Sequence, residues 1–217
     1  MHPIVVALAA VLAALCAAAL TSWLRRLAGT DSPWFRSRLH VGLAGLGGAG
    51  AALIADDWAE LAAYAALAVG CALLVVIDLT TLRLPNVLVG PLYPVILVLL
   101  TVSAASSGGW ARLGRASAAG GILFAVYFAL ALIRPSGLGL GDVKLAGLLG
   151  MFLGWLGWST LLAGSAAGFL LAGLVAATLV VIRRADRRTE FPFGPWMVLG
   201  TVVGATSTAV GSAVLLP

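Results

Sequence analysis

Charged residues are scarce in this sequence, and their scarcity excludes a water-soluble fold. Of the 217 residues, 10% are charged and 62% are hydrophobic, whereas about 25% of the residues in a soluble domain are charged. The mean hydropathy is +1.10. A helix that spans a membrane needs roughly 20 mainly apolar residues. The chain therefore has room for about eight spans joined by short connections, which predicts a single membrane-embedded domain over residues 1–217.

Potential metal ligands are also few. The two cysteines, Cys16 and Cys71, each lie in an apolar run, and His2 and His40 stand apart from each other. A disulfide framework or a zinc site needs clustered ligands, and two isolated histidines are not expected to be catalytic. We therefore predict no metal and no cofactor.

Most of the sequence consists of long apolar runs. These runs predict an all-α fold, a polytopic membrane helix bundle. Reading these runs against their flanks places the spans near residues 3–21, 41–55, 60–77, 87–104, 116–133, 144–157, 160–182 and 195–215. The second and sixth of these are short for the hydrocarbon core. Glycines inside the second run are expected to let helices approach closely.

The basic residues predict the orientation of the bundle. Eleven of them fall on one side: Arg25, Arg26, Arg36, Arg38, Arg83, Arg134, Lys144, Arg183, Arg184, Arg187 and Arg188. Only Arg112 and Arg115 fall on the other side. By the positive-inside rule the first side is cytoplasmic, and this topology explains the net charge of +5 better than a nucleic-acid partner does. The acidic residues of the second connection are expected to form a solvated outer patch: Asp56, Asp57 and Glu60.

Asp78 is the first candidate for chemistry. It follows the apolar run 72–77 without a turn residue, so its carboxyl group should lie at or just inside the membrane boundary, where ionisable groups are costly and usually functional. An interfacial cap or an ion pair with Arg83 is the structural alternative.

Asp142 is the second candidate, in a turn with glycines at 137, 139 and 141. Glycine permits unusual backbone conformations and close approach by another chain. A phosphate-binding turn is disfavoured because the acidic residue would repel an anion and the Walker pattern is absent. Two residues later comes Lys144, the only lysine in the chain, which either binds a substrate carbonyl or tunes a carboxylate, or is an ordinary positive-inside charge.

Two predicted spans separate Asp78 from Asp142, so both return to the cytoplasmic side. If they meet, one ionised and one protonated carboxyl group make an acid/base pair, because close like charges do not both ionise cheaply. Asp142, at the start of a span, faces the positive pole of a helix dipole, and Asp78 faces a negative pole. This favours Asp142 as the base.

These residues resemble the type IV prepilin leader peptidases of the GxGD group of intramembrane aspartic proteases. The matching stretches are residues 78–86 (DLTTLRLPN), 139–144 (GLGDVK) and 191–195 (FPFGP), and an aspartate upstream of GxGDxK is more specific than a lone glycine pattern. The resemblance implies that Asp78 and Asp142 are catalytic, without a metal or covalent intermediate. It also implies a prepilin or pseudopilin substrate, cut on the cytoplasmic face of a bacterial inner membrane.

The remaining residues of these stretches are expected to bind substrate or shape the site: Gly139, Gly141, Lys144, Pro85, Asn86, Pro192, Phe193, Gly194 and Pro195. Pro85 and Asn86 also suit a rigid stop and helix cap, and residues 192–195 suit either a re-entrant turn or a plain hinge.

Larger members of the family carry a cytoplasmic domain with paired cysteines after the first span. Residues 22–40 occupy that place here and suffice only for an interfacial arm, so cleavage without methylation is expected. Membrane lipid is the other expected partner. The alternative reading is a transport or scaffold protein in which both aspartates relay protons or pair with Arg83 and Lys144.

Overall fold

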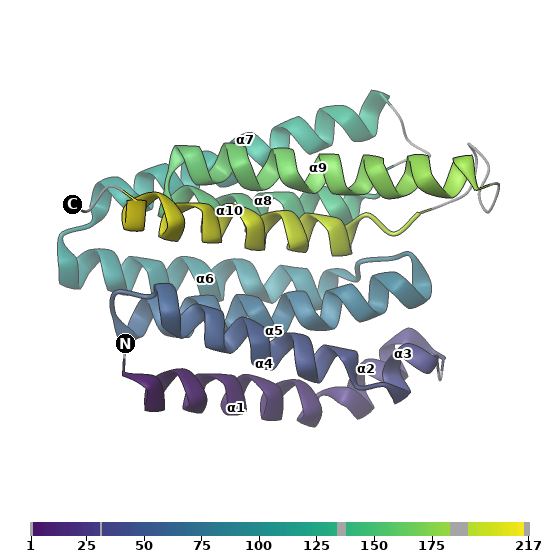
Figure 1. Cartoon of the computed structure of the whole chain (residues 1–217), viewed down its shortest axis with the longest axis horizontal. Helices are drawn as coiled ribbons and strands as arrows, with labels where there is room; N and C mark the ends of the chain where they lie inside the picture. Colours follow the sequence, from purple (N-terminus) through teal and green to yellow (C-terminus); the bar gives the residue numbers. More distant parts are fainter. Residues whose placement is uncertain (1, 31, 134–137, 183–190, 215–217) are drawn as a thin grey trace. The chain divides into compact units, whose positions relative to one another are not determined.

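The computed structural model describes residues 2–30, 32–133, 138–182 and 191–214. Gly137, Arg134, Arg183, Arg184, Arg187 and Arg188 lie outside the described residues. The described part contains helices and no strand, which confirms the all-α fold class (Figure 1). The helices are α1 (Pro3–Ala19), α2 (Thr21–Ala28), α3 (Pro33–Arg36), α4 (Leu39–Ile54), α5 (Trp58–Thr81), α6 (Asn86–Ser107), α7 (Trp110–Ile133), α8 (Leu140–Leu156), α9 (Trp158–Val181) and α10 (Gly194–Val214).

Each of the eight predicted spans coincides with a long helix. By length and hydropathy, α5, α6, α7 and α9 are each able to cross a membrane, and α1 with α2, bent by 44°, forms a possible fifth span among the described residues. The apolar helix α4 has 16 residues and is shorter than these. The chain is thus a multi-pass membrane protein, while the number of eight spans stays a prediction.

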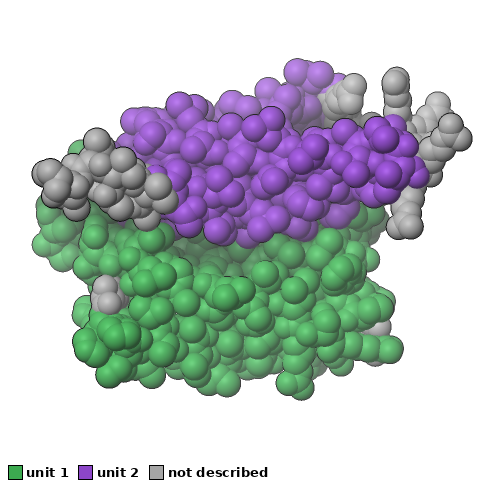
Figure 2. Space-filling view, viewed as in Figure 1, with its two compact units in different colours: residues 1–113 green, residues 114–217 purple. Residues whose placement is uncertain are grey.

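The chain forms two compact units, Met1–Leu113 and Gly114–Pro217, coloured separately in Figure 2. The division falls within α7, and the prediction of one domain stays a prediction. In unit 1, α4 packs against both α1 and α5, and α5 packs against α6. A Cβ atom at Gly48 would lie 2.6 Å from the carbonyl oxygen of Ala9. Close helix approach at a small residue is therefore confirmed there, whereas Gly42 and Gly50 have nothing within 4 Å.

In unit 2, α9 and α10 pack through facing glycines. A Cβ atom at Gly204 would lie 2.7 Å from Cα of Gly164, and one at Gly200 would clash with the backbone of Gly164 and Gly168. The two backbones are in contact because these positions carry no side chain. In α8, the residues from Val143 to Trp155 are buried except Lys144. Arg115 ends this helix by donating to the carbonyl oxygens of Gly154 at 2.6 Å and Trp155 at 2.8 Å.

Replacing one of these glycines is expected to destabilise unit 2. Gly200→Ala should lower the free energy of unfolding by about 1–3 kcal/mol, because a backbone cannot move aside as a flexible side chain does. The measurement is the midpoint of thermal unfolding in detergent. Gly173→Ala is the control, because Gly173 also lies in α9 but has nothing within 4 Å, and alanine is the better helix former. Equal midpoints for the two variants would contradict the packing role.

Candidate active site

Asp78 lies in the last turn of α5, at the end of the helix that is predicted to face the cytoplasm. The helix runs to Thr81, and the amide of Leu82 donates to the carbonyl oxygen of Asp78 at 2.9 Å. Leu82 has a φ of 52° and stops the helix in the left-handed conformation. The side chain of Asp78 is 4% exposed. The sequence placed Asp78 at the end of an apolar run, and the structure places it in a buried helical turn.

Pro85 and Asn86 follow Asp78 after a short connection and begin α6. Pro85 is the N-cap residue, with a φ of −71° and no side-chain capping bond, and Asn86 is the first helical residue. The predicted helix cap before α6 is therefore confirmed, but the N-cap residue is Pro85 and not Asn86. Asp78, Pro85 and Asn86 lie at the same end of the α5–α6 pair in unit 1.

Asp142 is the third residue of α8 in unit 2, and its carboxylate is bound to the start of its own helix. Its Oδ2 accepts the amide of Gly139 at 2.9 Å, while its own amide donates to the carbonyl oxygen of Gly139 at 3.0 Å. This reciprocal pair resembles a capping box. It orients the carboxylate and leaves Oδ1 without a hydrogen-bond partner in the described part of the chain. The side chain is partly buried.

The glycines beside Asp142 are not explained by backbone strain. Gly139 has a φ of −77°, a value that any residue adopts, and Gly141 is not among the described glycines with positive φ. The expectation of unusual backbone conformations is therefore wrong at both positions. A Cβ atom at Gly139 would instead lie 3.4 Å from Oδ2 of Asp142. The missing side chain keeps the surroundings of the carboxylate open.

Lys144 lies in α8, two residues after Asp142. Residues two apart in a helix do not face each other, so direct contact with Asp142 is disfavoured by the helix itself. Both predicted roles of Lys144, binding a substrate carbonyl and tuning a carboxylate, stay predictions.

An aromatic cluster joins α7, α9 and the start of α10 within unit 2. Phe193, just before α10, contacts Tyr127 of α7 and Phe169 of α9, with ring centroids 6.1 Å and 5.7 Å away, and Tyr127 lies 5.1 Å from Phe169. The carbonyl oxygen of Phe193 accepts the amides of Trp196 and Met197. Residues 192–195 thus form a helix start that holds Phe193 against this cluster.

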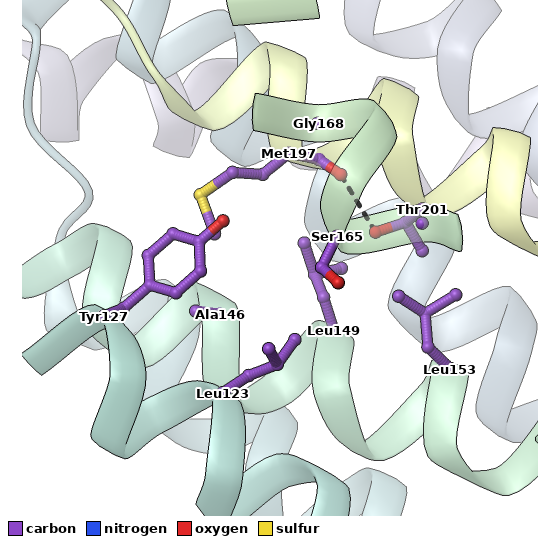
Figure 3. A pocket seen from close by; sticks show the side chains of 10 residues that line it. Leu123, Tyr127, Ala146, Leu149, Leu153, Ser165, Gly168, Met197 and Thr201 are labelled. Carbon is purple, nitrogen blue, oxygen red and sulfur yellow. Dashed lines mark hydrogen bonds between the residues drawn. The ribbon is translucent and has the colours of Figure 1, made fainter. Parts of the chain in front are cut away.

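A cavity of about 10 Å³ adjoins Tyr127, with room for about one water molecule. Figure 3 shows the Tyr127 ring beside the side chain of Met197, with Thr201 bonded to the Met197 carbonyl oxygen at 2.9 Å. Its lining is mostly apolar: Leu123, Tyr127, Ala146, Leu149, Leu153, Gly164, Ser165, Gly168, Met197 and Thr201. This cavity is too small for a peptide and is a packing space behind the aromatic cluster.

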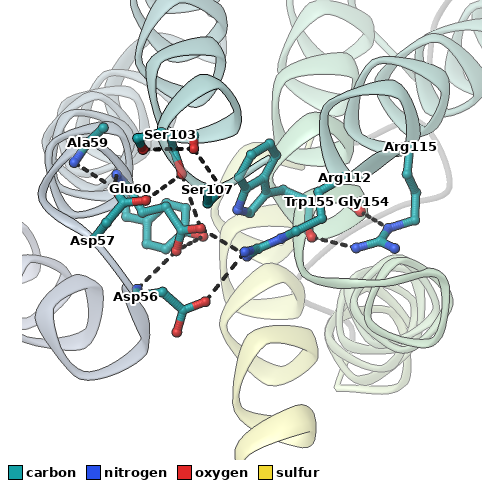
Figure 4. A network of polar contacts seen from close by, with 12 residues as sticks. Asp56, Asp57, Ala59, Glu60, Ser103, Ser107, Arg112, Arg115, Gly154 and Trp155 are labelled. Atoms are coloured by element: carbon teal, nitrogen blue, oxygen red, sulfur yellow. Dashed lines mark hydrogen bonds and ion pairs between the residues drawn. The ribbon is translucent and has the colours of Figure 1, made fainter. Parts of the chain in front are cut away.

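The acidic residues at the other end of α5 form a closed network instead of a solvated patch. Glu60 is fully buried and pairs with Nη2 of Arg112 at 2.9 Å, while Tyr64 donates to it at 3.1 Å (Figure 4). Ser103 of α6 donates to Oδ2 of Asp57 at 2.6 Å. The prediction of a solvated patch is wrong for Glu60, because α6 and the first turn of α7 cover it. Only Asp56 remains well exposed.

Asp57 caps α5 in this network. Burial raises its pKa, but hydrogen bonds from Ser103 and from the amides of Glu60 and Ala59, together with the charge of Arg112, outweigh burial and leave the pKa below the ordinary 3.8. A carboxyl group with a depressed pKa contributes stability that is present above its unfolded-state pKa and is lost as the pH falls through its folded-state pKa.

Asp57→Asn is therefore expected to lower the midpoint of thermal unfolding at neutral pH. The difference in midpoint between the variant and the parent should shrink below a pH of about 4. At such a pH the carboxylate of Asp57 in the parent becomes protonated and loses the charge that the variant lacks. Thermal unfolding at the two pH values measures this. A difference that is independent of pH would show that the charge of Asp57 contributes nothing.

Comparison with known proteins places the chain in a family. The family described as the type IV leader peptidase family matches residues 65–183. The chain belongs to the type IV leader peptidase family. It is also similar to the prepilin leader peptidase/N-methyltransferase of Aeromonas hydrophila, at 33% identity over 147 residues, which make up 67% of this chain and 49% of the relative. The chain thus spans about half the length of that relative, and no solved structure matches it.

The match to the type IV leader peptidase family includes both aspartates. Asp78 and the Gly139–Asp142 pair lie within residues 65–183, whereas Phe193 lies beyond them. Asp78 belongs to unit 1 and Asp142 to unit 2, and their pairing stays a prediction. Tyr127 and Phe169 were not singled out from the sequence, because aromatic residues inside apolar spans carry no distinguishing local signal.

Proposed function

We propose that this chain is a membrane-embedded aspartic endopeptidase that removes the basic leader of a prepilin or pseudopilin. The observation that carries the proposal is the oriented carboxylate of Asp142 at the start of α8, held by the amide of Gly139. The buried Asp78 at the end of α5 supplies a second carboxyl group. Both lie in the segment matched by the type IV leader peptidase family.

In the proposed mechanism the two aspartates share the acid and base roles. Asp142, at the positive pole of α8, is ionised and removes a proton from the attacking water. Asp78, at the negative pole of α5, is protonated and donates to the scissile carbonyl oxygen. The water oxygen bonds to the carbonyl carbon. The C–N bond then breaks as the leaving amine takes the proton from Asp142, and the hydroxyl proton of the intermediate returns to Asp78.

The other predicted residues shape the substrate site in this proposal. Gly139 and Gly141 leave room for an extended peptide beside Asp142, and Lys144 binds a substrate carbonyl oxygen. Phe193, held by the helix start at Pro192, Gly194 and Pro195, presents an apolar wall with Tyr127 to the hydrophobic segment of the substrate. Pro85 and Asn86 fix the connection after Asp78.

The proposed location is a bacterial inner membrane, with the active face in the cytoplasm. The basic residues of the connections support this orientation. We further propose cleavage without N-methylation, because the segment between α1 and α4 forms only the short helices α2 and α3 in its described residues.

The test is co-expression with candidate prepilins from the same genome, in a host without a prepilin peptidase of its own. Leader removal is followed by the mobility shift of the pilin and by N-terminal sequencing. The double variant Asp78→Asn/Asp142→Asn is the inactive reference. Cleavage by the parent alone supports the proposal, whereas equal processing by both, or none with any candidate, would favour a transport or scaffold role.

A further inference from the structure

A hollow of about 580 Å³ opens in unit 1 where α1 bends into α2, beside the start of α4. We call it the arginine hollow. Its lining is Ala18, Thr21, Ser22, Arg25, Arg26 and Arg38. All of these residues lie in unit 1, and the predicted catalytic aspartates do not line it. Its volume lies within the range of about 300–1,000 Å³ that is usual for sites that hold a small molecule or headgroup.

The lining concentrates positive charge. Nε of Arg26 donates only to the carbonyl oxygen of Ser22, at 3.3 Å, and neither Arg26 nor Arg38 has a carboxylate partner in the part of the chain that the structure describes. Arg25 donates to the carbonyl oxygen of Phe35 at 3.4 Å. The guanidinium groups of Arg26 and Arg38 repel each other, and an anion bound between them removes that repulsion.

Hydroxyl groups lie beside the arginines, because Thr21 and Ser22 also line the hollow. Thr21 Oγ1 donates to the carbonyl oxygen of Ala17 at 3.3 Å and lies 2.8 Å from Nε2 of His40, whereas the exposed Ser22 leaves its hydroxyl group available to a ligand. His40 is fully buried and is not part of the lining. The hollow therefore combines charged and neutral donors, as sites for phosphate oxygens do.

The backbone at Arg38 is held in a conformation that an arginine seldom adopts. Arg38 is the N-cap residue of α4 and has a φ of 52°. A glycine would adopt this φ without steric cost, and such outliers persist where the surrounding structure enforces them. Here the outlier carries a guanidinium group into the lining of the hollow.

The residues around the arginine hollow are of the kinds found at the depth of the lipid headgroups. The short helices α2 and α3 each bury one large apolar residue, Leu24 and Phe35, against the bundle. Trp34 is 44% exposed beside them. Tryptophan is enriched at membrane–water interfaces, and basic residues there attract anionic lipid. The chain itself thus brings the hollow to the headgroup layer at one end of the apolar helix α1.

We propose that the arginine hollow binds the phosphate group of an acidic phospholipid. The guanidinium groups of Arg26 and Arg38 are the principal ligands, and Ser22 supplies a hydroxyl donor. The bound lipid holds the bend between α1 and α2 in place. This inference does not depend on peptidase activity.

Binding is measured by native mass spectrometry of the full chain in detergent, titrated with dioleoylphosphatidylglycerol and, separately, with dioleoylphosphatidylcholine. The parent is expected to retain one phosphatidylglycerol in preference to phosphatidylcholine. Arg38→Gly and Arg26→Gln should each weaken this binding by about tenfold, the effect of losing one charged hydrogen-bonding partner. Arg83→Gln, which removes an exposed basic residue outside the hollow, should leave the binding unchanged.

Arg38→Gly separates binding from folding. Because glycine suits the φ of 52°, its thermal unfolding without lipid should match or exceed that of the parent. Inorganic phosphate is the competitor that distinguishes the source of the phosphate group. Loss of the lipid on adding inorganic phosphate at equal concentration would show that the hollow binds free phosphate and would overturn the lipid assignment. Equal retention of both lipids, or equal weakening by Arg83→Gln, would overturn the site.

Discussion

Asp142→Asn is expected to lower the rate of leader cleavage by about 10³-fold or more, the range of a lost general base. The fold should survive, because the amide oxygen of asparagine still accepts the Gly139 amide that now bonds to Oδ2 of Asp142 at 2.9 Å. The measurement is the single-turnover rate on a purified prepilin in detergent, together with the midpoint of thermal unfolding. An unchanged midpoint with a lost rate assigns the effect to chemistry.

Asp78→Asn is expected to produce a similar loss, because the pair acts as a unit and its effects are not additive. The double variant should therefore be little slower than either single variant. Asp56→Asn is the matched control, since its side chain is 75% exposed and lies near the opposite end of α5 from Asp78. Cleavage retained within about tenfold by either catalytic variant would contradict the dyad.

Arg112→Ala is expected to have the second largest effect, a loss of about 2 to 3 kcal/mol of unfolding free energy. The reason is that Glu60 is 0% exposed and loses the guanidinium that lies 2.9 Å from its Oε1. Removing one partner leaves an uncompensated buried charge, which costs more than the pair contributes. Thermal and denaturant unfolding of the purified chain in detergent measure the loss.

A double-mutant cycle tests the cause. In a Glu60→Gln background the same Arg112→Ala change should cost much less, because glutamine carries no charge that needs a partner and still accepts from Tyr64. If Arg112→Ala costs the same in both backgrounds, the destabilisation comes from lost packing of the arginine stem and not from the ion pair. Arg83→Ala controls for the loss of an exposed arginine.

The helix boundaries show where reasoning from hydropathy fell short. The third predicted span ended at residue 77, whereas α5 continues to Thr81 and includes Asp78. The fifth began at residue 116, whereas α7 begins at Trp110. An apolar run marks the part of a helix that lies in lipid, while the backbone hydrogen bonds of the helix continue beyond it until a residue such as Leu82, at a φ of 52°, ends them.

The acidic connection shows a different limit. Asp56, Asp57 and Glu60 stand together in the sequence, and local reasoning treats them alike. In the structure the three differ in burial. Ser103 and Arg112, about forty to sixty residues later in the chain, contact all three, but only Glu60 is fully buried. Burial of a side chain depends on what covers it, and the covering residues are distant in the chain.

The sequence by itself determined the all-α class, the position of each long helix and the membership of Asp78 and Asp142 in recognisable motifs. These features are local, because apolar runs, helix starts and short motifs are complete within a few turns of chain. Only the tertiary structure decided that Gly139 orients the Asp142 carboxylate, that Phe193 meets Tyr127 and Phe169, and that three arginines surround one hollow. Such arrangements arise from the packing of helices and from turn geometry, neither of which is encoded in any single segment.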